Sequence, residues 1–122
     1  WDAALQTLVV CMTLDYLSGV VVAGVFKRSE KSSDGALDSR AGFRGLCKKG
    51  AELALVLVGA RLDHLLGGDW ARTAIILFFI GNEGLSILEN LGLMGVPYPA
   101  FLREALDMLK EQNDRGQNDS ET

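Results

Sequence analysis

Three long apolar runs separated by polar connections dominate the sequence. They occupy residues 3–26, 51–66 and 73–94. The first run contains a single charge, Asp15, and a helix of its length would measure roughly 36 Å at about 1.5 Å per residue. That length is enough to cross a hydrocarbon core of about 30 Å with some tilt. The pattern therefore predicts an all-α integral membrane protein.

The second run is the shortest and has the most charge near its ends. Glu52 stands at its start, and Arg61, Asp63 and His64 follow its apolar centre. It crosses a bilayer only if the charged side chains at its two ends extend to opposite interfaces. The expected elements are transmembrane helices at about 3–26, 48–66 and 70–95, a short amphipathic helix at 99–110, and a disordered polar tail at 111–122.

Polar side chains interrupt the third run with helical spacing. Glu83, Ser86 and Asn90 share one face at i, i+3 and i+7, and Asn82, Ser86 and Glu89 lie on nearly the same face. Ionisable groups inside a membrane are costly, so they face other helices or water. The third helix is therefore expected to present a polar stripe to partners or to an aqueous path.

A soluble helical bundle with a buried polar network is the alternative fold. Asp15 and Glu83 each stand alone in the middle of a run, whereas a soluble amphipathic helix repeats charge at every turn. The connection 27–50 holds seven Lys or Arg and the turn 67–72 holds one. The positive-inside rule then places the N-terminus outside the cell and the C-terminus in the cytoplasm.

Depth along the helices predicts which charged groups meet. Asp15 and Glu83 lie at similar depth, where two carboxylates cannot both ionise without water or donors such as Asn82. Lys49 and Glu89 each lie roughly 30 Å from the turn after the second run, so we expect them to approach each other.

Two smaller sets complete the predicted contacts. Lys48 is a further candidate for an ion pair with Glu89. Gly19 and Ala23 form a small-residue pair at i and i+4, which suits close helix packing.

Composition excludes several functions. The net charge is −4, and no basic face with interleaved aromatic residues is present, so a nucleic-acid partner is not expected. His64 is the single histidine and no cluster has metal-ligand spacing, which predicts neither an enzyme, nor a metal site, nor a cofactor. Cys11 and Cys47 are read as free thiols in a reducing compartment.

Several motifs together resemble a known family. They are DYLSG at 15–19, GFRGLCKK at 42–49, FFIGNEGLSILEN at 78–90 and GVPYP at 95–99. From Trp1 to about Leu109 the chain is similar to the small phage-lysis and toxin-secretion holins of bacteria and their phages. The segment 29–39 is longer and more charged than the usual linker of that family.

The resemblance implies a function without catalysis. Such proteins accumulate in the bacterial cytoplasmic membrane, form homo-oligomers and open lesions through which an endolysin or a toxin leaves the cell. The implied partners are the lipid bilayer, further copies of the chain, and that cargo. The candidate residues for contacts between copies or for lining a lesion are Asp15, Asn82, Glu83, Ser86, Glu89 and Asn90. Packing within a single three-helix unit is the alternative role for the same residues.

Two other functions fit parts of the pattern. Carboxylates in mid-membrane are typical of proton relays, which favours a small ion- or proton-conducting subunit. The amphipathic segment 101–109 would suit a membrane adaptor that binds a partner.

Overall fold

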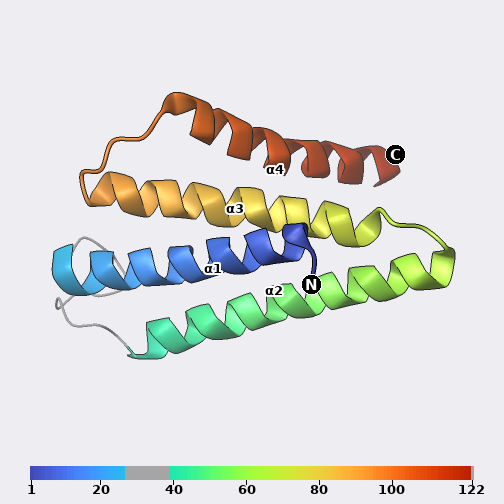
Figure 1. Ribbon diagram of the computed structural model, residues 1–122, viewed down its shortest axis with the longest axis horizontal. Helices are drawn as coiled ribbons and strands as arrows, with labels where there is room; N and C mark the ends of the chain where they lie inside the picture. The colour runs from blue at the N-terminus through green and yellow to red at the C-terminus, as the bar shows by residue number, and fades with distance from the viewer. Residues whose placement is uncertain (27–38, 122) are drawn as a thin grey trace.

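The computed structural model describes residues 1–26 and 39–121, and all of its regular structure there is helical (Figure 1). The elements are α1 (Ala3–Val21), which continues into a π-helical turn η1 (Val22–Phe26), α2 (Ser39–Leu66), α3 (Ala71–Leu93) and α4 (Ala100–Glu121). The prediction of an all-α protein is confirmed.

The connections between helices follow local rules. Asp2 caps α1 by accepting a hydrogen bond from the Leu5 N–H at 3.0 Å. Gly67 has φ +70° in the turn from α2 to α3, and Gly95 has φ +83° after α3. Glycine adopts this left-handed conformation without the steric strain that a Cβ atom brings, so both positions end a helix sharply.

The helix α3 is the centre of the molecule. Successive helices run in opposite directions, so α1 and α3 are parallel, and α3 contacts each of the other three helices (Figure 1). The buried apolar cluster joins α1, α2 and α3 and consists of Leu8, Met12, Val56, Ile76, Phe79 and Ile80. This core lies mainly in the half of the bundle where α1 and α3 begin.

Small residues allow α1 and α2 to approach. The Tyr16 ring lies over Gly42 and Gly45, where added Cβ atoms would be 3.3 Å from Tyr16 Oη and 3.9 Å from Tyr16 Cδ2. Glycine at position 42 leaves room for the Tyr16 hydroxyl, whereas a Cβ atom at Gly45 would make only an ordinary contact with the ring.

Large apolar side chains cover the outside of α1 and α2. On α1 the exposed ones include Val10, Leu14, Leu17 and Val21, and on α2 they include Leu53, Leu55, Leu57, Val58, Leu62, Leu65 and Leu66. An exposed apolar surface of this extent is unusual for a soluble monomer and suits contact with lipid or with other proteins. Two helices are long and apolar enough to cross a membrane, Ala3–Val25 and Ala71–Leu93. They coincide with the first and third predicted spans.

Two helix boundaries differ from the prediction. The helix α2 begins at Ser39 and not near residue 48, because no proline interrupts 39–47 and Tyr16 packs on its glycines. The helix α4 continues to Glu121 in the segment expected to be a disordered tail from residue 111. It too contains no proline after Pro99, and it lies along α3. The unusual linker 29–39 falls almost entirely outside the described residues.

Candidate functional site

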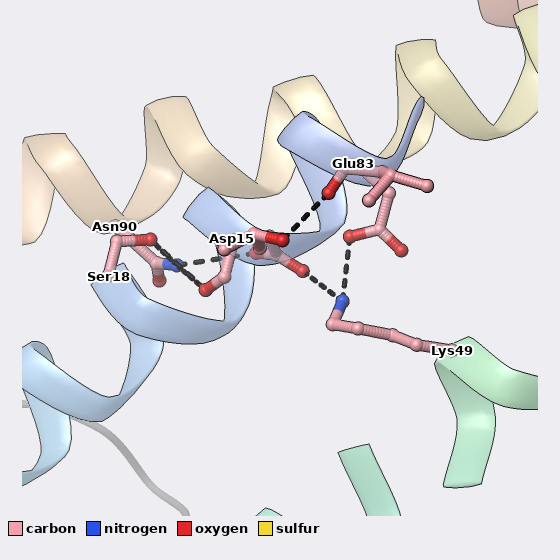
Figure 2. A network of polar contacts seen from close by, with 7 residues as sticks. Asp15, Ser18, Lys49, Glu83 and Asn90 are labelled. Atoms are coloured by element: carbon pink, nitrogen blue, oxygen red, sulfur yellow. Dashed lines mark hydrogen bonds and ion pairs between the residues drawn. The ribbon is translucent and has the colours of Figure 1, made fainter. Parts of the chain in front are cut away.

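A lysine from α2 lies between two carboxylates from the other helices of the bundle. Lys49 Nζ is 2.7 Å from Asp15 Oδ2 of α1 and 2.8 Å from Glu83 Oε2 of α3, as Figure 2 shows. The side chains are only 15%, 14% and 4% exposed for Lys49, Asp15 and Glu83. Because they are removed from water, these charges depend on one another for compensation. The ion cluster therefore ties three helices together at one level.

Amide and hydroxyl groups extend this cluster along the α1–α3 contact. Asn90 Nδ2 donates to Ser18 Oγ at 2.8 Å and lies 3.4 Å from both Asp15 Oδ1 and the Asp15 carbonyl oxygen (Figure 2). The Ser18 hydroxyl donates in turn to the Asp15 carbonyl at 3.1 Å. Gly19 lies beside Asn90, where an added Cβ atom would make an ordinary contact of 3.8 Å with Asn90 Nδ2.

A third carboxyl group lies at the edge of the cluster. Glu52 is one helical turn after Lys49 on α2 and is 7% exposed. Its Oε2 atom is buried without a hydrogen-bond partner. Glu52 therefore adds a third buried acidic side chain on the helix that carries Lys49.

The predicted stripe residues divide into two groups. Asp15, Glu83 and Asn90 meet in the cluster, and Ser86 is half-buried on the same side of α3 as Glu83 and Asn90. The donor that faces both carboxylates is Lys49 and not Asn82, which the sequence suggested as a donor. Asn82 is half-buried and Glu89 is exposed, and both lie on another side of α3.

The expected approach of Lys49 to Glu89 is replaced by a different pairing. The Lys49 amine contacts Asp15 and Glu83, while Glu89 and Lys48 are exposed. The prediction compared the depths of backbone positions along the helices. The flexible four-carbon side chain of lysine places its amine well away from its own backbone. Burial also favours the partners inside the bundle over a carboxylate at its surface.

Sequence reasoning did not identify Ser18 as a member of the site. It carried a signal, because Ser18 follows Asp15 at i+3. Ala23, predicted to pack between helices beside Gly19, is 5% exposed in the π-helical turn.

A second polar contact holds the opposite end of the bundle. Arg72 at the start of α3 donates to both carboxylate oxygens of Asp2 at 2.8 and 3.1 Å. This guanidinium and the Leu5 N–H hold the pKa of Asp2 well below its usual value. Asp63, near the end of α2, caps α3 by accepting from the Ala71 and Arg72 N–H groups at 2.8 and 2.9 Å.

The cluster is a set of polar contacts that stabilises the packing of three helices. Within residues 1–26 and 39–121, no group of three or more His, Cys, Asp or Glu side chains is arranged to hold a metal ion. Charged and amide groups from α1, α2 and α3 instead satisfy one another across the helix contacts. Separation of the helices would leave each group in need of a new polar partner.

Comparison with known proteins agrees with the membrane character of the helices. A model of the bacteriophage holin family matches residues 1–111. An uncharacterized protein of Clostridium perfringens is 47% identical over 115 residues, which cover 93% of this chain and 79% of that protein. A probable holin of Bacillus phage phi105 is 33% identical over 112 residues, which cover 91% of this chain and 77% of that protein. No solved structure matches. The family match extends over all the transmembrane candidates and the residues of the ion cluster, and the chain therefore belongs to the bacteriophage holin family.

Proposed function

We propose that this chain is a holin that assembles in the bacterial cytoplasmic membrane and opens lesions through which an endolysin, or a toxin, leaves the cytoplasm. The observation that carries the proposal is the family match over residues 1–111, which includes every helix that contributes to the ion cluster. The similarity to a probable phage holin supports it. Holins act without catalysis, so the buried charges are read as contacts between helices.

Three crossings of the membrane are part of this proposal. The helices α1 and α3 have the length and apolarity of spans, and α2 is proposed as the third. Support for α2 as a membrane span comes from the contrast between its two sides. Leu55, Leu57 and Val58 are exposed on its outside, while Lys49 and Glu52 are turned into the bundle. The connection before α2, which contains Lys27, Arg28 and Lys31, then lies in the cytoplasm, with the N-terminus outside and the end of α3 inside.

We assign different roles to the two groups of stripe residues. Asp15, Glu83, Ser86 and Asn90 hold one protomer together through Lys49. Asn82 and Glu89, at i and i+7 on a side of α3 away from the cluster, are proposed to contact neighbouring copies. A single polar contact between membrane helices contributes only about 0.6–2 kcal/mol, so assembly requires several contacts per copy.

Inducible expression in a bacterium that carries a cytoplasmic muralytic enzyme tests this function. A holin gives normal growth and then abrupt lysis, because the enzyme reaches the cell wall only when lesions open. The same cells without the muralytic enzyme are the control and should stop growing without lysing. Unaltered growth of the test strain, with the folded protein in its membrane, would contradict the proposal.

Conduction of protons is a second candidate, favoured by Asp15 and Glu83 on either side of Lys49 and by the buried Glu52 one helical turn along α2. Vesicles that contain the purified chain separate the two functions. A holin should release an entrapped fluorescent dextran of protein size, whereas a proton conductor should dissipate a pH gradient and retain the dextran. An adaptor role for α4 has less support, because Leu106 and Leu109 of its apolar side already face α3.

A further inference from the structure

The helix α4 fits against α3 through two glycines. A Cβ atom at Gly81 would lie 2.9 Å from the Leu106 carbonyl oxygen and 3.2 Å from Lys110 N. A Cβ atom at Gly84 would lie 2.7 Å from Leu106 Cδ2. Only glycine lets the two helices approach this closely, and Leu109 packs against the apolar core from the same side. The contact is thus specific to α4 in this position.

The position of this contact along α3 has consequences for the membrane. Gly81 lies near the middle of Ala71–Leu93, the candidate span, so Lys110 of α4 is level with the middle of the span. The two helices run antiparallel along one another (Figure 1). Residues 100–110 of α4 therefore lie beside the half of α3 that ends at Leu93.

The side of α4 turned away from α3 carries charge together with two apolar side chains. Its exposed charged residues are Arg103, Glu104, Asp107 and Glu111, which follow one another at helical spacing, and Phe101 and Met108 are exposed among them. Lipid chains offer no partner for such groups, and ionisable side chains within a membrane face water or one another. In contrast, the exposed sides of α1 and α2 are apolar and suited to lipid.

We propose that α4 stays docked on Gly81 and Gly84 of α3 in the open lesion and that its charged side lines the water-filled path. This inference rests on the proposed holin function and identifies the element that faces the water. The apolar outsides of α1 and α2 then face lipid, the ion cluster holds the protomer, and α4 separates α3 from the lumen.

A cysteine pair tests whether α4 remains docked. Gly84→Cys combined with Leu106→Cys, in a chain carrying Cys11→Ser and Cys47→Ser, should form a disulfide, because a Cβ atom at Gly84 would lie 3.3 Å from the present Leu106 Cγ. Each single cysteine under the same oxidant is the control. Oxidised and reduced forms in phosphatidylethanolamine–phosphatidylglycerol vesicles should release entrapped dextran equally. Loss of release on oxidation, with recovery on reduction, would show that α4 must leave α3 and would overturn the inference.

Charge reversal on α4 provides a second measurement that does not depend on a disulfide. In planar bilayers with a salt gradient, Asp107→Lys and Glu104→Lys should shift the reversal potential of the lesion toward anions. Asp69→Lys, the same charge change in the exposed turn between α2 and α3, is the matched control. A shift no larger than that of the control would contradict a lumenal α4. If the parent chain opens no lesion in either system, the proposed function itself fails, and the inference fails with it.

Discussion

At the scale of single residues, Lys49 connects three helices of the bundle. It is the cation between two carboxylates on different helices, and all three side chains are largely removed from water. We expect Lys49→Met to lower the free energy of unfolding by about 3–5 kcal/mol, because it leaves buried charge without compensation. Unfolding by a strong detergent in mixed micelles measures the loss. Lys48→Met, one residue away and exposed, is the control and should change stability little. Equal stability of the two variants would contradict a stabilising role for the Lys49 ion pairs.

Glu83 tests the same cluster in a different way. The amide of Glu83→Gln keeps an acceptor oxygen for Lys49 but removes one of the two carboxylates that contact its amine. We therefore expect a smaller loss of stability than for Lys49→Met, together with a shifted onset of lysis after induction. Glu89→Gln is the matched exposed control for stability. Unchanged lysis timing and oligomer size in Glu83→Gln would remove Glu83 from the mechanism.

The residues of the site show how far sequence reasoning reaches at this scale. The constant rise of a helix was sufficient to predict similar depths for Asp15 and Glu83, and in the structure both contact Lys49. The identity of that partner was not predictable from rise alone. It depends on the rotation of α2 about its axis and on the conformation of a long lysine side chain, both of which are set by tertiary packing.

At the scale of helices, glycine positions determine which pairs approach closely. A Cβ atom at Gly59 of α2 would lie 2.7 Å from Ile75 Cδ1 and 3.2 Å from Arg72 Cα, and the backbone atom cannot move away easily. We expect Gly59→Ala to destabilise the bundle by about 1–3 kcal/mol through overpacking. Gly50→Ala in the same helix meets nothing within 4 Å and should be neutral or stabilise by up to about 1 kcal/mol. Detergent unfolding of both variants measures the difference, and a Gly59→Ala variant as stable as Gly50→Ala would contradict the close approach.

The helices themselves were largely predictable, and their ends were not. Apolar runs located α1, α3 and the centre of α2, and the turn at Gly67 was marked by its two glycines and Asp69. The start of α2 was not predictable, because the polar sequence 39–47 is typical of a loop. Its helical structure depends on packing against Tyr16, which the sequence does not show. The docking of α4 was also missed: its apolar side was evident, but the complementary Gly81 and Gly84 lie in a run that reads as lipid-facing.

At the scale of the whole molecule, polar groups are concentrated inside and apolar groups outside. The Lys49 cluster is buried, whereas Val10, Leu14 and Leu57 are about half exposed or more. A chain arranged in this way has no stable monomeric state in water, since its outer surface is removed from water only by lipid, detergent or other copies. We therefore expect the purified chain to remain dispersed in detergent micelles or lipid nanodiscs and to associate into large particles when detergent is removed. Sedimentation velocity with and without detergent measures this.

Three Leu→Gln changes on the outside of α2, at Leu55, Leu57 and Leu62, should reduce the dependence on detergent without touching the cluster. A parent chain that sediments as a single monomer in plain buffer would contradict both the membrane assignment and the lesion built on it.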